Sequence, residues 1–266
     1  MKCPTPISIR APDLTYTTSN IAVPCGRCGI CLGNEITMWK IRLTEESKKQ
    51  IANSFLTLTY NDENLPKNGV NKEHVQLFIK RMRKYWKFRY YLISEYGPGT
   101  NRPHYHAILF GIDNYTNDNM IQKIEKIWSK GFITLANVYP SRINYIAQYH
   151  AQKFSNPPGS NRNFKLLSSK PAIGDNYINR EKNFHWGEKQ MYYRNGTFKL
   201  ALPRFYKTRL YDKATIRRAS NKMQEQADID EINKAMSDKN YYQKMYSSKQ
   251  AACQQIINKY KKNRKL

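Results

Sequence analysis

Alternating apolar and polar residues first identify a strand at residues 53–60, NSFLTLTY, in which Phe55, Thr57 and Thr59 share one face. After Asn71 the period changes from two to the three and four of a helix, and Asn71 is a suitable N-cap. The apolar positions of this helix are Val75, Phe78, Ile79, Met82 and Trp86. Its opposite face carries four cations: Lys80, Arg81, Arg83 and Lys84.

The same alternation returns in residues 88–95 and 104–110, which are separated by the turn sequence YGPGTNRP and should pair as a hairpin. A second amphipathic helix is expected over residues 118–130 and a fourth strand over 132–138. A third helix should start at the cap Ser141 and stop before Pro157. Strands and helices thus follow one another as strand, helix, strand, strand, helix, strand.

This order predicts an α+β fold of the ferredoxin-like, split βαβ type, with an antiparallel sheet and its helices packed on one face. The other face is then free for a ligand. Around this core the chain divides into segments: 1–50 contains cysteines and a helix, 51–157 is the core, 158–211 forms loops and a small hairpin at Asn195-Gly196, and 212–266 is a basic, mostly helical extension.

Charge points to a polyanionic partner, because 45 Lys and Arg outnumber 20 Asp and Glu and leave a net charge of +25 spread along the chain. Twenty Tyr, ten Phe and four Trp accompany these cations, which favours single-stranded nucleic acid with bases exposed for stacking. The alternative is a basic surface that binds nothing. Because no apolar run of about 18 residues and no signal-peptide core occurs, we expect an intracellular protein without a membrane partner.

His104 and His106 stand one residue apart on a predicted strand, so both imidazoles project from one face while Tyr105 points the other way. Glu95 ends the preceding strand and should lie across the hairpin from them. Two nitrogens and one carboxylate form an open set of ligands that accepts Mg²⁺ or Mn²⁺ and leaves positions for phosphate oxygens. The alternatives are ordinary surface histidines and an ordinary charge at a strand end.

Tyr145 and Tyr149 are four residues apart on the third helix, so their hydroxyls share one face, which Lys153 continues. A tyrosine attacks well only when a metal or a cation stabilises its phenolate, and Lys153 can supply part of that positive field. Aromatic residues at this spacing also occur simply as packing residues, and this alternative stays open.

Four of the five cysteines, Cys3, Cys25, Cys28 and Cys31, lie near the N-terminus, which suggests metal binding in a reducing compartment. Four thiolates suit a structural Zn²⁺. The two-residue spacing requires a tight turn, which Gly26 and Gly29 permit. The alternative is a set of buried or free thiols, and Cys253 is expected to be an ordinary helix residue.

FLTLTY, RPHYHAILFG and YIAQYHAQK resemble, in this order, the three motifs of HUH endonucleases that initiate rolling-circle replication. Further segments, PCGRCGIC, SEYGPGTNRPHYHAILFG, SSKPAIG and LPRFYKTRLY, resemble the replication initiators of microviruses of the gokushovirus type, which are phages with single-stranded DNA. The resemblance covers about residues 1–211.

The resemblance implies a nickase with a divalent metal at Glu95, His104 and His106, and with Tyr145 and Tyr149 as nucleophiles that act in turn beside Lys153. It implies a 5′-phosphotyrosine link to the phage replication origin and a free 3′-OH that primes synthesis. A host helicase and a DNA polymerase are the implied partners, and the cytoplasm of the bacterial host is the implied location. The DNA-binding candidates are Arg102, Lys80, Arg81, Arg83 and Lys84.

Two rival interpretations remain. A non-catalytic single-stranded DNA-binding or genome-packaging protein would explain the charge and the aromatic residues, but not an ordered set of histidines, carboxylate and tyrosines. A plasmid initiator or relaxase would share the chemistry and differ in its DNA target.

Overall fold

The computed structural model describes residues 3–10, 20–50, 52–113, 118–151, 156–187 and 190–262. These residues form two compact units, one made of residues 36–183 and the other of residues 1–35 together with 184–266. Helix α1, Gly29–Lys49, belongs to both. The division into four segments expected from the sequence stays a prediction.

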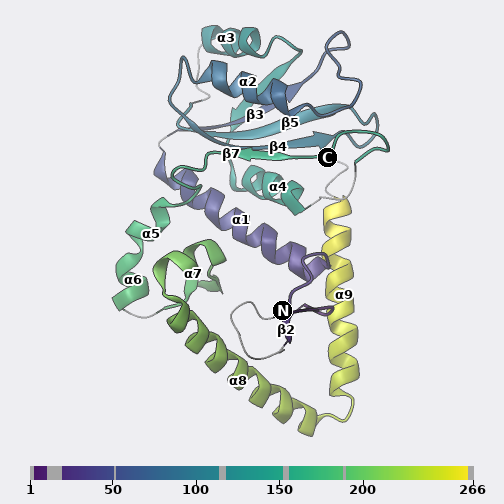
Figure 1. The fold of residues 1–266 in the computed structure, drawn as a ribbon, viewed down its shortest axis with the longest axis vertical. Coiled ribbons are helices and arrows are strands. Elements are labelled where there is room, and N and C mark those ends of the chain that lie inside the picture. The colour runs from purple at the N-terminus through teal and green to yellow at the C-terminus, as the bar shows by residue number, and fades with distance from the viewer. Residues whose placement is uncertain are drawn as a thin grey trace. The chain divides into compact units, whose positions relative to one another are not determined.

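The unit of residues 36–183 is built on an antiparallel sheet with the strand order β6-β3-β5-β4-β7 (Figure 1). The predicted order of strands and helices is confirmed: β3 Asn53–Thr59, α2 Lys72–Met82, β4 Arg89–Tyr96, β5 Pro103–Phe110, α3 Asp118–Trp128 and β6 Ile133–Asn137. This is the expected ferredoxin-like arrangement. The sheet is extended at its edge by β7, Lys165–Leu167, which pairs with β4 and was not expected from the sequence.

Helices α2 and α3 pack on one face of this sheet (Figure 1). The amide of His74 donates to the Asn71 side chain at 3.0 Å, which confirms the predicted cap of α2. The buried core contains side chains of both helices and alternate residues of the strands, among them Leu56, Leu58, Tyr105, Phe78 and Trp128. Because side chains alternate along a strand, residues 55, 57, 104 and 106 must face the opposite side.

That opposite side is not free, contrary to the expectation from the sequence. Helix α4, Pro140–Ala151, and the second half of α1 lie against it (Figure 1). The ring of Trp39 in α1 lies 5.1 Å from the ring of Tyr91 in β4, and buried Glu46 accepts from Arg89 Nε at 2.5 Å. The expectation failed because a sheet buries apolar residues such as Tyr91 and Ile108 on both faces only when both are covered.

The start of α4 also differs from the prediction. Ser141 lies inside the first turn, because the helix begins at Pro140 and the carbonyl of Tyr139 accepts from the amides of Arg142 and Ile143 at 2.9 and 3.1 Å. Proline suits the first helical position, since it lacks an N–H that would be unpaired there. This change moves the helix start by one residue and leaves the faces of α4 as expected.

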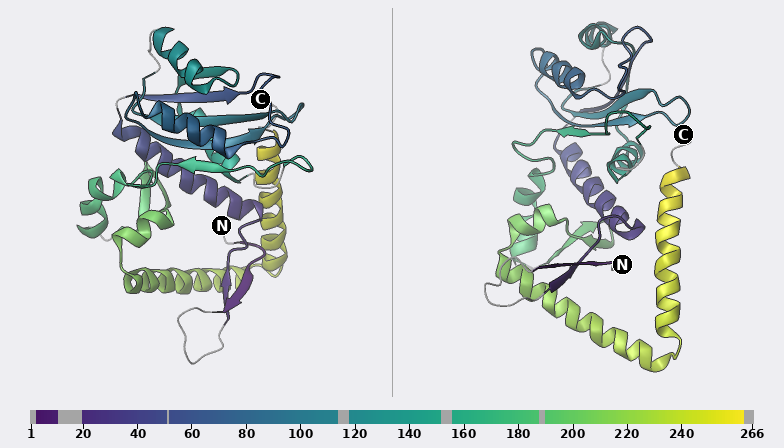
Figure 2. Two further views of the ribbon diagram at one scale, coloured as in Figure 1. Left: turned by 45° about the horizontal axis from the view of Figure 1, so that its top comes forward. Right: turned by 45° about the vertical axis from the view of Figure 1, so that its right-hand side comes forward.

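The unit of residues 1–35 and 184–266 contains short strand pairs and long helices. Its elements are β1 Ile7–Arg10, β2 Asn20–Val23, β8 Tyr192–Asn195, β9 Phe198–Ala201, α7 Arg204–Leu210, α8 Lys213–Ser237 and α9 Tyr241–Lys262. Helix α6, Lys182–Gly187, and helix α5, Asn176–Arg180, lie at and before its boundary. Figure 2 shows α8 and α9, coloured green to yellow, as two long helices joined by a short turn.

The predicted hairpin at Asn195-Gly196 is confirmed: Asn195 pairs with Phe198, and Gly196 has a φ of 60°. The helical character of the C-terminal extension is confirmed as well, although α8 has no buried residue. Among the residues described here, no helix combines the length and the apolar character that crossing a membrane requires.

The core between α2 and the sheet gives a stability prediction. Phe78 is buried and lies edge-on to Trp128 with ring centroids 5.7 Å apart, whereas its neighbour Leu77 is 47% exposed. Phe78→Ala should lower the free energy of unfolding by roughly 3–5 kcal/mol, because it removes buried surface and leaves a cavity. The matched control Leu77→Ala should change it by less than about 0.5 kcal/mol. Urea unfolding followed by circular dichroism measures both, and equal losses would contradict this packing.

Candidate active site

The hairpin of β4 and β5 brings together the three predicted metal ligands. Its register places Glu95 opposite His104 and Ile93 opposite His106, so the carboxylate and both imidazoles lie on the sheet face that α4 covers. The turn closes with a hydrogen bond of 2.9 Å from the amide of Gly97 to the carbonyl of Arg102. Tyr105 points into the core on the other face, as predicted, and its hydroxyl lies 2.9 Å from that of Tyr60.

The three ligand atoms are close enough to hold one ion. Glu95 Oε2 lies 3.4 Å from His104 Nε2 and 3.3 Å from His106 Nε2. Two atoms that each lie about 2.1 Å from one ion, at bond angles of about 90–109°, are roughly 3.0–3.4 Å apart. Glu95 and His106 are only 4% and 8% exposed, so a cation there would also offset a buried carboxylate. The residues therefore fit a divalent metal.

Both histidines are oriented by their second ring nitrogen. His104 Nδ1 lies 3.1 Å from the carbonyl oxygen of Arg102, which can only accept, so the proton is on Nδ1 and the Nε2 lone pair faces Glu95. His106 Nδ1 lies 3.1 Å from the Thr57 hydroxyl on β3. Such partners fix the tautomer and the ring direction of metal-binding histidines. Burial lowers the pKa of His106, which favours the neutral imidazole that binds a metal.

Sequence reasoning placed Thr57 on this face but assigned it no role. The signal was present in the alternation of residues 53–60, but the partner of Thr57 depends on the register between β3 and β5, which pairs Thr57 with His106. A strand register between distant segments is a tertiary feature, so the motif alone does not reveal this contact.

Helix α4 places Tyr145 beside the three ligands. The Tyr145 hydroxyl lies 3.5 Å from Glu95 Oε2 and 3.5 Å from His106 Nε2. Its ring meets that of His106 edge-on with centroids 5.4 Å apart, and Phe55 lies on the same side at 6.4 Å. Tyr145 is thus held at the site by its neighbours on the sheet.

The second tyrosine and its lysine are less fully described. Tyr149 belongs to α4 one turn after Tyr145, but its side chain lies outside the described part. Lys153 falls on residues 152–155, which are also outside it. Their assigned roles stay predictions.

A cation on α4 that sequence reasoning missed is Arg142, one turn before Tyr145. Its guanidinium carbon lies 5.6 Å from the centre of the Phe55 ring, and it donates to the carbonyl of Asn137. A spacing of three residues from a nucleophile candidate was the available signal.

The candidate DNA-binding residues fall into two places. Arg102 is near the metal ligands, where it donates to Asp62 at 2.6 Å and to the Tyr60 carbonyl at 2.9 Å. The four cations of α2 are exposed on the layer that covers the other face of the sheet. Arg81 and Lys84 line a groove of about 740 Å³ with residues of α3: Asn119, Gln122, Lys123, Lys126 and Ile127.

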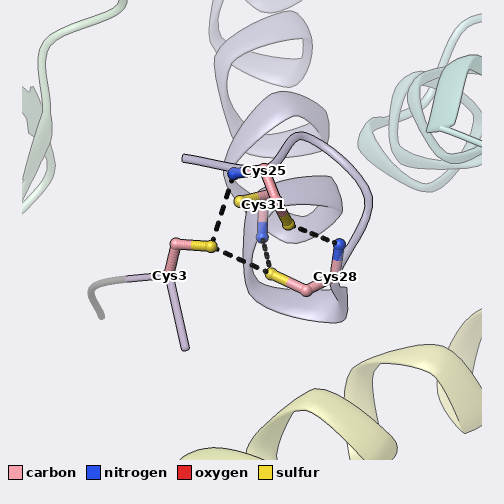
Figure 3. Close-up of side chains that lie close together, drawn as sticks. All are labelled: Cys3, Cys25, Cys28 and Cys31. Carbon is pink, nitrogen blue, oxygen red and sulfur yellow. Dashed lines mark hydrogen bonds between the residues drawn. The ribbon is translucent and has the colours of Figure 1, made fainter. Parts of the chain in front are cut away.

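The four N-terminal cysteines come together in the other unit, where their sulfur atoms all lie within 4.8 Å of one another (Figure 3). Cys253 lies in α9 and is not part of this group.

Comparisons with known proteins agree with the order of these motifs. The family model of the ORF2-type replication-associated proteins matches residues 53–154. The replication-associated protein ORF2 of Spiroplasma virus 4 is 34% identical over 157 residues, which cover 50% of this chain and 49% of that protein.

Two further relatives extend the match. The replication-associated protein ORF4 of Chlamydia phage 1 is 26% identical over 184 residues, covering 59% of this chain and 46% of that protein. The replication-associated protein VP4 of Bdellovibrio phage phiMH2K is 27% identical over 229 residues, covering 73% and 71%. The chain thus spans about half the length of the first two relatives. No solved structure matches it significantly.

The matched segment 53–154 contains β3, the hairpin of β4 and β5, and α4, which are the elements that carry the metal ligands and Tyr145. The resemblance found in the sequence is therefore confirmed, and the chain is a homologue of the replication-associated proteins of phages of the microvirus type.

Proposed function

We propose that this protein is the endonuclease that starts rolling-circle replication of a phage genome, by cutting one DNA strand and keeping its 5′ end on a tyrosine. The observation that carries the proposal is the position of the Tyr145 hydroxyl, 3.5 Å from both Glu95 Oε2 and His106 Nε2. A phosphate that lies against a metal held by these ligands would be within reach of that hydroxyl.

The chemistry is a transesterification. The Tyr145 oxygen attacks the phosphorus, a bond from this oxygen to phosphorus forms, and the bond from phosphorus to the 3′ oxygen breaks. The phenol releases its proton, and the leaving 3′ oxygen takes one up, so the products are a 5′-phosphotyrosine and a free 3′-OH. The number of phosphate ester bonds is unchanged, and for this reason no nucleoside triphosphate is consumed.

Each side chain has a separate part in this reaction. Glu95, His104 and His106 would hold Mg²⁺ or Mn²⁺, which supplies positive charge to the phosphate oxygens and to the developing phenolate. Thr57 and the carbonyl of Arg102 keep the histidine rings in the binding orientation. Lys153 and Arg142 are the cations proposed to hold the phosphate or the phenolate.

The joining reaction requires a second hydroxyl. After one round of synthesis, Tyr149 would attack the regenerated origin while Tyr145 is still linked to DNA, and the free 3′-OH would then attack the first link and close a circle. Both tyrosines are on α4, one turn apart. We infer that the reaction takes place in the cytoplasm of the bacterial host, with a host helicase and DNA polymerase extending the free 3′ end.

The metal assignment gives the first test of this function. His106→Ala should abolish cleavage of an origin strand in Mn²⁺, because it removes one of the three ligands from the buried site. DNA binding should be largely retained, since charge and stacking supply it. Denaturing gels measure cleavage and filter binding measures affinity.

Two further variants make this test specific. Thr57→Val keeps all three ligands and should raise the Mn²⁺ concentration needed for half-maximal cleavage by about 10–100-fold, as removal of an orienting partner does. His74→Gln, on α2 across the sheet, should leave that concentration unchanged. Normal cleavage by His106→Ala in chelator-treated buffer would overturn the metal assignment.

The tyrosines give the second test. Tyr145→Phe should slow the first cleavage by about 10²-fold, because Tyr149 must then act from a displaced position. Tyr149→Phe should cut normally but fail to release closed circles, and the double variant should form no covalent adduct. Mass spectrometry of the trapped peptide locates the link. An adduct on Tyr105, Tyr139 or another tyrosine would refute the assignment.

The groove between α2 and α3 gives the third test. Arg81→Ala combined with Lys84→Ala should weaken DNA binding and reduce the slope of log affinity against log salt by about 1 for each phosphate that is no longer neutralised. Cleavage at saturating DNA should not change, because the groove is on the other side of the sheet. Lys72→Ala, an exposed cation at the start of the same helix, is the control. An unchanged salt slope in the double variant would exclude the groove from DNA binding.

A further inference from the structure

The four N-terminal cysteines form a cluster that the proposed nickase reaction does not use. We propose that Cys3, Cys25, Cys28 and Cys31 bind one structural Zn²⁺ that ties the N-terminal residues to the start of α1. This proposal does not depend on the proposed function, because it concerns other residues and another unit of the chain.

The sulfur positions fit a tetrahedral ion. All four Sγ atoms lie within 4.8 Å of one another, and Cys3 Sγ lies 3.7 Å from Cys28 Sγ (Figure 3). Four sulfurs at the Zn–S distance of about 2.3 Å in a tetrahedron are about 3.8 Å apart. A disulfide would require a separation of about 2.0 Å.

The loop before α1 has the tight turn that the two-residue spacing needs. Gly26 has a φ of 71°, a left-handed conformation that a residue with a side chain rarely adopts, and it turns the chain between Cys25 and Cys28. The amides of Arg27 and Cys28 then donate to Cys25 Sγ at 3.4 and 3.3 Å. Sulfur that accepts backbone N–H groups is stabilised as thiolate, the form that binds zinc.

Cys28 also occupies the N-cap of α1. Its carbonyl accepts from the amide of Leu32 at 3.0 Å, and its Sγ accepts from the amide of Cys31 at 3.5 Å. A negative sulfur at this place interacts favourably with the helix dipole. The same atoms thus cap the helix and complete the cluster, and the amide of Cys25 adds a contact of 3.4 Å to Cys3 Sγ.

Packing does not account for the cluster. Cysteines collected by a hydrophobic core are buried, but Cys3, Cys25 and Cys28 remain partly exposed. The hairpin that follows Cys3 has little core of its own, since β1 is exposed throughout and Ile7, Ile9 and Ile21 are each more than 40% exposed. A hairpin that buries so little apolar surface needs another source of stability, and metal binding supplies folding free energy directly.

The test uses the full chain purified from zinc-containing medium and counts metal by mass spectrometry. We expect about one tightly held Zn²⁺ per chain, which Cys28→Ser loses and the control Cys253→Ser keeps. The double variant His104→Ala/His106→Ala should also keep it, which separates this site from the nickase metal. Co²⁺ loaded in place of Zn²⁺ should give the visible and near-ultraviolet absorption of tetrahedral cobalt bound to thiolates.

Alkylation of the unmodified chain covers the case in which Cys28→Ser does not fold. Bound Zn²⁺ should protect the four clustered cysteines from N-ethylmaleimide until a chelator is added, whereas Cys253 should react at the same rate with or without it. Zinc well below one equivalent, together with four thiols that react equally fast before and after chelation, would overturn the proposal. Zinc that disappears in the double histidine variant and persists in Cys28→Ser would overturn it as well.

Discussion

The antiparallel pairing of β4 with β5 is the constraint on which the candidate site depends. Its register sets Glu95 opposite His104 and sends Tyr105 into the core. A slip of one residue would turn the histidines toward α2 and α3 and bring Tyr105 to the other face. The buried hydroxyl contacts of Tyr105 with Tyr60 and with the Asn71 backbone therefore also stabilise the position of the metal ligands.

The two faces of the sheet divide structure from chemistry. One face buries the main core under α2 and α3, and the exposed sides of these helices carry the basic groove. The other face holds the ligands, covered by α4 and anchored at one end by the ion pair of Glu46 with Arg89. Because α4 lies directly over the ligands, a tyrosine on that helix reaches them without any loop that would have to close.

The two candidate metal sites differ as their donor atoms require. Two imidazoles and a carboxylate leave open positions for a substrate phosphate, which suits catalysis, whereas four thiolates complete a tetrahedron and leave none, which suits a structural role. Each site is formed by residues near in sequence, across a hairpin turn or within a tight loop. Only Cys3 and Tyr145 come from a distant segment in either case.

The sequence by itself determined the order of the elements, the cap at Asn71, the hairpin turn at Asn195-Gly196 and the pairing of Glu95 with the histidines, because these follow from local periodicity and short turns. Only the tertiary structure decided that Thr57 orients His106, that Tyr145 lies against Glu95, and that α1 and α4 cover the second face. It also decided the approach of Cys3 to the loop before α1. These contacts join residues 22 or more positions apart, and no local pattern records which distant surfaces will pack together.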